Sequence, residues 1–110
     1  MPDATQPSPE DRPLAHSVYF RLNEDASPEE LIAACRDYLT GHPGTLHFSV
    51  GQRAEQYQRA VNDEGFDVAL VLVFESDRAH DAYQASDRHK QFLAEQLPNC
   101  MQVRVFDSYG

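Results

Sequence analysis

The segment Phe66–Glu75, "FDVALVLVFE", carries apolar side chains on both faces that a β-strand would present. One face would hold Phe66, Val68, Leu70, Leu72 and Phe74, and the other Ala69, Val71 and Val73. A strand with this pattern has to be covered on both sides by other parts of the structure. The rest of the sequence must therefore supply two covering layers.

Alternation of apolar and polar residues predicts three further strands. In the segment 15–22, the residues His16, Val18, Phe20 and Leu22 would share one face. In the segment 45–52, Leu46, Phe48 and Val50 would share a face, and "MQVRVFDS" (101–108) has the same period. The chain thus contains four expected strands.

Serine residues mark the expected starts of three helices, because a serine side chain can accept a hydrogen bond from the first free backbone N–H groups. Ser27 precedes a run that ends at Gly41 and Pro43, and Ser76 and Ser86 precede two shorter runs. The residues at helical spacing are Leu31, Cys35, Tyr38 and Leu39 in the first run, Ala79, Ala82 and Tyr83 in the second, and His89, Phe92, Leu93 and Leu97 in the third.

Two segments lack such patterns. The first thirteen residues hold four of the seven prolines and predict a disordered tail. The polar stretch 53–65 predicts a long connection between two strands. The folded domain is therefore expected to span residues 14–110.

The order of the expected elements is β-α-β-β-α-β, which indicates an α+β protein of the ferredoxin-like class, with an antiparallel sheet and its helices on one face. The helices would cover the face of Phe66, Val68 and Leu70. The opposite face, with Ala69, Val71 and Val73, has no further element of the chain to cover it. A homodimer that pairs two such sheets would cover it and form a dimeric α/β barrel.

Composition excludes several classes of partner. The chain of 110 residues is one domain, and 18 acidic against 9 basic side chains give a net charge of −9, which disfavours nucleic acid. No apolar run is long enough to span a bilayer, so no membrane association is expected. Two distant cysteines and no recognisable signal segment indicate a cytoplasmic protein with reduced thiols.

Five ordered blocks between Leu14 and Ser108 resemble the Dabb family, the stress-responsive dimeric α/β-barrel domain. These blocks are "AHSVYFRL", "HPGTLHFSVGQ", "GFDVALVLVFES", "HDAYQASDRHKQF" and "VRVFD". The resemblance implies a ferredoxin-like protomer that pairs with its twin, and a largely apolar pocket between sheet and helices. It implies no metal and no organic cofactor.

Some plant members of this family resemble polyketide cyclases of the olivetolic acid cyclase type, which close a chain by aldol condensation. By that resemblance His89 is the candidate general base, Tyr83 helps hold the substrate, and His16 lines the pocket. Two positions depart from the pattern. Val68 stands where those members have another histidine, and Ser86 with Asp87 replaces a His-Pro pair. These departures argue against an aldol condensation more than they argue against the pocket.

We therefore carry two hypotheses. The first is a binding module for a small apolar or aromatic ligand, with a pocket lined by His16, Val18, Phe20, Phe66, Val68, Leu70 and Phe92. The second is a cofactor-free enzyme, either a cyclase or a small monooxygenase, with His89 and Tyr83 as its catalytic residues.

For each histidine the alternative is a purely structural role in the core. His47 and His80 show no spacing typical of a metal site on one element, so no metal ligands are expected.

Overall fold

A computed structural model describes residues 12–110. The expected disordered tail falls outside these residues except for its last two. Arg12 and Pro13 contact the C-terminus, where the backbone N–H of Gly110 donates to the carbonyl of Pro13 at 2.8 Å. The residue before the first strand is therefore hydrogen-bonded to the last residue of the sequence.

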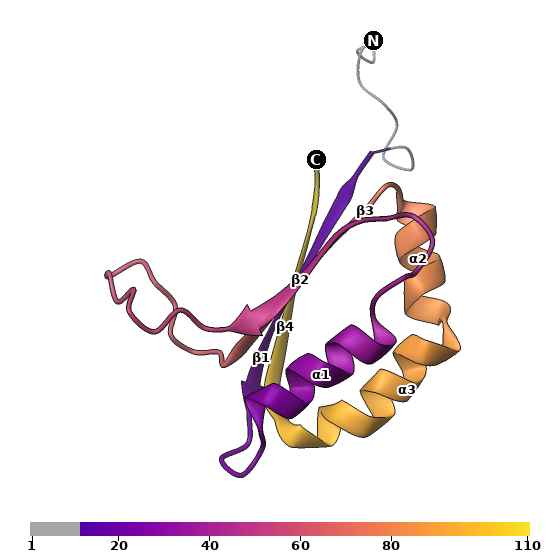
Figure 1. The fold of residues 1–110 in the computed structure, drawn as a ribbon. Helices are drawn as coiled ribbons and strands as arrows, with labels where there is room; N and C mark the ends of the chain where they lie inside the picture. Colours follow the sequence, from indigo (N-terminus) through magenta and orange to yellow (C-terminus); the bar gives the residue numbers. More distant parts are fainter. Residues whose placement is uncertain (1–11) are drawn as a thin grey trace.

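The chain forms one four-stranded antiparallel sheet with three helices on one side (Figure 1). The elements are β1 (Leu14–Leu22), α1 (Pro28–Tyr38), β2 (Thr45–Gln52), β3 (Val68–Phe74), α2 (Asp77–Ala85), α3 (Asp87–Gln96), a short 3-10 helix (Leu97–Asn99) and β4 (Cys100–Tyr109). The strand order β2-β3-β1-β4 places β1 and β3 at the centre. The ferredoxin-like α+β fold is confirmed.

The three serine caps are confirmed. The side chains of Ser27, Ser76 and Ser86 accept hydrogen bonds from the backbone N–H groups three residues further on. Ser86 ends α2 and begins α3 with a backbone in the extended region, so the two helices meet at an angle rather than continue as one. This break lets both helices follow the curvature of the sheet.

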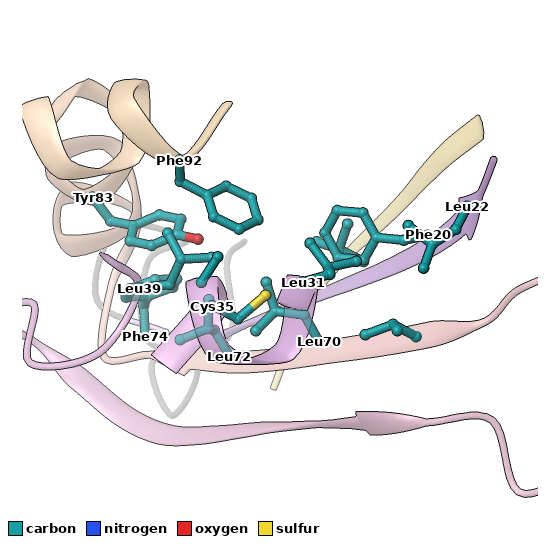
Figure 2. Packing of buried hydrophobic residues seen from close by; sticks show 13 residues of the cluster. Phe20, Leu22, Leu31, Cys35, Leu39, Leu70, Leu72, Phe74, Tyr83 and Phe92 are labelled. Carbon is teal, nitrogen blue, oxygen red and sulfur yellow. The ribbon is translucent and has the colours of Figure 1, made fainter. Parts of the chain in front are cut away.

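The helix-facing sides of β1 and β3 form the core. Along both strands, buried residues alternate with half-buried ones. Val68 belongs to the same buried cluster as Leu31 of α1 and Phe92 of α3, as the expected register requires. Figure 2 shows Leu31 and Phe92 in this cluster. A slip of one residue would have turned Val68 to the opposite face.

Phe66 was expected on the same face as Val68, and this prediction is wrong. β3 begins only at Val68, although the backbone of Asp67 still bonds to Phe20 and Arg53. The carboxylate of Asp67 accepts a hydrogen bond from the backbone N–H of Leu22 at 2.7 Å. Phe66 therefore lies on the face away from the helices, with its ring 5.0 Å from that of Tyr19.

Leu46 also departs from the expected alternation. The pairing of β2 with β3 shifts between Thr45 and His47, so Leu46 is the extra residue of a β-bulge and is 60% exposed. Phe48 and Val50 stay packed against the core as expected.

The stretch 53–65 contains no helix or strand, which confirms a long connection. It extends away from the body of the molecule, on the side of the sheet opposite the helices (Figure 1). Val61 near its end is 86% exposed. Within residues 12–110 there is also no helix that is long and apolar enough to cross a membrane.

The turn before β2 makes the first testable prediction. Gly44 has φ of +84°, and a Cβ there would lie 2.5 Å from Cβ of Ala79 in α2. Gly41 has φ of +75° but open space around it. We expect Gly41→Ala to cost about 1–2 kcal/mol from backbone strain, and Gly44→Ala to cost about 1–3 kcal/mol more from the clash. Urea unfolding measures both, and equal losses would contradict the close approach of α2.

Candidate functional site

A cavity of about 160 Å³ lies between the sheet and helices α2 and α3. It is lined by His16, Val18, Phe20, Leu39, Leu70, Tyr83, Gln84, His89, Phe92, Leu93, Leu97, Val103 and Val105. Most of this lining is apolar. The polar exceptions are two histidines, one tyrosine and one glutamine, which is the usual character of a small-molecule site.

The strand β4 forms one rim of this cavity. It pairs with β1 at the edge of the sheet, and Val18 lies opposite Val105 in that pairing. Val105 is 50% exposed, whereas Val18 is buried. The helices thus cover the central strands but leave this edge open, so a molecule could enter between α3 and β4.

His16 is held at the edge of the cavity by Asp107. The two residues are direct neighbours across β1 and β4, and Nδ1 of His16 lies 2.6 Å from Oδ1 of Asp107. A carboxylate can only accept, so Nδ1 of His16 donates. This hydrogen bond fixes the ring and leaves Nε2 as the nitrogen available to the cavity.

Tyr83 and His89 lie side by side in the lining of the cavity, and the Tyr83 ring is 6.0 Å from that of His16, measured between centroids. Their ring centroids are 4.8 Å apart in an edge-to-face arrangement, and no hydrogen bond joins them in the described chain. The Tyr83 side chain points from α2 into the core (Figure 2). Burial, with a smaller effect from Cys35, raises the pKa of Tyr83, so the phenol stays protonated and can donate.

His89 is buried without full hydrogen bonding. Its Nδ1 has no partner among the described residues, and burial lowers its pKa, with smaller effects from the neighbouring His16, His42 and His80. The ring is therefore neutral near pH 7. Because Nδ1 is enclosed by protein, Nε2 is the nitrogen that a bound molecule could reach.

Two further histidines surround the same aromatic cluster. His42 packs its ring 5.0 Å from that of Tyr83, and its Nε2 donates to the carbonyl of Tyr38 at 2.8 Å. His80 lies 4.9 Å from His16, measured between ring centroids. The pKa of His80 is lowered, mainly by burial and next by the nearby His16, while Asp107 acts in the opposite direction.

The structure brings together most of the residues proposed from the sequence. His16, Val18, Phe20, Leu70, Tyr83, His89 and Phe92 all line the cavity. Val68 does not, because it is fully buried beneath α1, and Phe66 lies on the other face of the sheet. The substitution of a histidine by Val68 thus falls outside the cavity in this chain.

Sequence reasoning did not single out Asp107 or His42. Asp107 lies in an alternating strand where a carboxylate looks like a solvent-facing residue, and only its pairing with His16 gives it a neighbour. His42 follows a helix end in the "GHPG" turn, where a structural cap is the usual interpretation. The pairing of 14–22 with 100–109 was the signal that would have found Asp107.

Cys35 can be set aside as a nucleophile. It is fully buried on α1, and burial, with Cys100 as the next cause, raises the pKa of its thiol to about 12. A thiolate is the reactive form, so this thiol is inert at neutral pH.

A family model for the stress responsive A/B barrel domain, Dabb, matches residues 14–109. The chain belongs to the Dabb family. No functionally curated protein matches its sequence.

Solved structures share this fold. A dimeric ferredoxin-like protein of unknown function from Thermobifida fusca has a TM-score of 0.75 at 19% identity, over 92% of this chain and 93% of its own. A hydroxynitrile lyase from Passiflora edulis has a TM-score of 0.74 at 21% identity, over 91% and 94%. A Dabb protein from Mesorhizobium loti has a TM-score of 0.70 at 17% identity, over 88% and 95%.

The buried histidines predict a loss of stability in acid. Burial holds the pKa of His80 and of His89 below the ordinary histidine value of about 6.5, so below that pH the unfolded chain binds protons that the folded chain resists. The free energy of unfolding should therefore be greatest above that pH and fall as the pH drops through it.

Urea unfolding between pH 5 and pH 8 measures this dependence. His89→Gln should flatten part of the slope, while His47→Gln, which removes an exposed histidine on β2, should keep it. An unchanged slope in His89→Gln would show that His89 takes up its proton without cost.

Proposed function

We propose that this Dabb domain binds a small, largely apolar molecule of about one ring in the cavity between β1, β4, α2 and α3. The observation that carries this proposal is a cavity with an apolar lining and a few inward polar groups, beside an edge strand that no helix covers. A histidine that served only the core would normally have its ring nitrogens hydrogen-bonded, whereas Nδ1 of His89 has no partner among the described residues.

The size of the cavity limits the ligand. A volume of about 160 Å³ is close to that of engineered protein cavities that bind benzene, at roughly 150 Å³. Pockets for drug-sized molecules are larger, on the order of 300–1,000 Å³. The cavity therefore suits a single ring or a short aliphatic chain, and disfavours a long polyketide.

The polar groups would orient that molecule. Tyr83 offers a phenol that donates, and the bond to Asp107 leaves Nε2 of His16 open to accept. A ligand with one carbonyl or hydroxyl group on an apolar body would match this lining.

A second candidate function is proton abstraction by His89, and its lowered pKa favours it. A neutral imidazole near pH 7 can take a proton from carbon next to a carbonyl, while the Tyr83 hydroxyl donates to the developing enolate oxygen. The same fold occurs in a solved neighbour named as a hydroxynitrile lyase and in one of unknown function, so the choice between binding and catalysis rests on the site residues.

We further propose that the chain works as a homodimer through the sheet face away from the helices. Ala69, Val71 and Val73 of β3 are only half-buried in one chain. Tyr19 adds an aromatic contact with Phe106, whose ring lies 5.7 Å away and is 56% exposed. Two structural neighbours are described as dimeric, which supports this proposal.

We also propose a cytoplasmic location, which the free thiols of Cys35 and Cys100 support.

The ligand proposal is tested with single-ring probes. Saturation-transfer NMR with phenol and benzaldehyde should detect binding to the wild-type protein. Val105→Trp should fill the open rim and abolish that binding, because Val105 lines the cavity and is half exposed. Val61→Trp, on the extended connection, is the matched control and should bind as before. Binding that survives Val105→Trp in a folded protein would place the probe elsewhere, and no binding at millimolar concentration would refute the proposal.

The dimer proposal is tested by light scattering at micromolar concentration. The wild-type protein should have twice the chain mass of 12.5 kDa. Val71→Asp should shift it to the mass of one chain, since a buried unpaired charge at the centre of an interface is costly. Ala94→Asp, which adds the same charge to the exposed side of α3, should leave the dimer intact. A wild-type monomer would refute the interface.

A further inference from the structure

His16, His80 and Asp107 bring three metal-ligating groups together from β1, α2 and β4. One potential ligand atom from each lies within 4.8 Å of the other two. Nothing in their sequence spacing indicates this, because the three residues come from distant segments. We propose that they form a binding site for a divalent transition-metal ion such as Zn²⁺.

The donor set suits such an ion. Two imidazoles and one carboxylate are a common ligand set for zinc and for non-haem iron, whereas Mg²⁺ prefers oxygen ligands. His16 is buried and His80 is only 15% exposed in its side chain, so two ligands are held within the fold. The carboxylate of Asp107 is 42% exposed and provides the route by which an ion enters.

The geometry needs only small side-chain movements. Ligand bonds of about 2.1 Å at tetrahedral angles separate ligand atoms by about 3.4 Å. The His16–Asp107 pair, now 2.6 Å apart, would open slightly, and the other distances of up to 4.8 Å would close. The amide nitrogen of Gln84 lies 3.2 Å from Nε2 of His80. With Nδ1 of His80 as the metal ligand, Nε2 would carry the proton, and the Gln84 amide would turn its oxygen toward it to hold the ring.

The surrounding charge favours a cation. The carboxylate of Asp81 lies 3.8 Å from Nδ1 of His80, and the carboxylate of Asp107 is itself one of the proposed ligands. A metal ion on Nδ1 of His16 would take the place of the proton that Nδ1 now donates to Asp107, and in a neutral ring this proton would move to Nε2. Because a ligand nitrogen must be unprotonated, binding should strengthen as the pH rises.

Three protein ligands leave at least one coordination position free. Because His16 also lines the cavity, that position would lie beside it, within reach of water or of an oxygen on a bound molecule. The metal site goes beyond the proposed ligand binding and does not depend on it, since the ion can be titrated with the cavity empty.

Isothermal titration calorimetry of the full chain with Zn²⁺ is the test. We expect one saturable site per chain at micromolar affinity and no comparable site for Mg²⁺. His80→Gln and Asp107→Asn should each weaken Zn²⁺ binding more than about tenfold. His47→Gln should not, because His47 is an exposed histidine outside the cluster.

Each outcome decides the proposal. The proposal is overturned if Zn²⁺ shows no saturable binding, or if His80→Gln and Asp107→Asn bind Zn²⁺ as tightly as the wild-type protein. It is also overturned if His47→Gln loses as much Zn²⁺ affinity as those two variants. Thermal melting checks that the variants fold. Should His80→Gln unfold, Asp107→Asn decides alone, because its side chain is partly exposed and isosteric with the original.

Discussion

The structure depends on the register of β1 between β3 and β4. This strand pairs on both sides, so its alternation decides which residues of three strands face the helices. The register sets Val18 opposite Leu70 and Val105, and places the buried core on one face. It also sets His16 opposite Asp107, which turns a lone buried histidine into a hydrogen-bonded pair at the edge of the cavity. A shift of one residue would separate this pair and move the apolar row of β1 into solvent.

The site follows from where the helices stop. Helices α2 and α3 lie over the centre of the sheet but leave the edge strand β4 partly exposed. The cavity lies between these helices and that strand. Polar groups are tolerated there because each has a distinct environment. His16 has a carboxylate partner, Tyr83 is a protonated phenol, and His89 is neutral with an unpaired nitrogen. Histidine rings packed on aromatic rings thus replace the larger apolar side chains that a purely structural core would use.

Local signals in the sequence predicted local structure well. Ser27, Ser76 and Ser86 cap their helices as expected, and the alternation in β1 and β3 gave the correct buried face. The predictions for Phe66 and Leu46 failed because each lies at a strand end, where Asp67 and a β-bulge break the period. Asp107 and His80 could not be placed from pattern alone. Their neighbours are set by strand pairing and by the position of α2 over the sheet, which depend on contacts between distant segments.

The central claim is that strand register fixes the His16 ring by its bond to Asp107, while burial on α3 keeps His89 neutral in the same cavity. Long-range ¹H–¹⁵N NMR of the imidazole nitrogens, near neutral pH and with a chelator present, tests it most directly. We expect His16 to show a proton fixed on Nδ1, with that signal altered in Asp107→Asn, and His89 to be neutral. Rapidly averaging tautomers at His16, or a protonated His89 at neutral pH, would contradict the account.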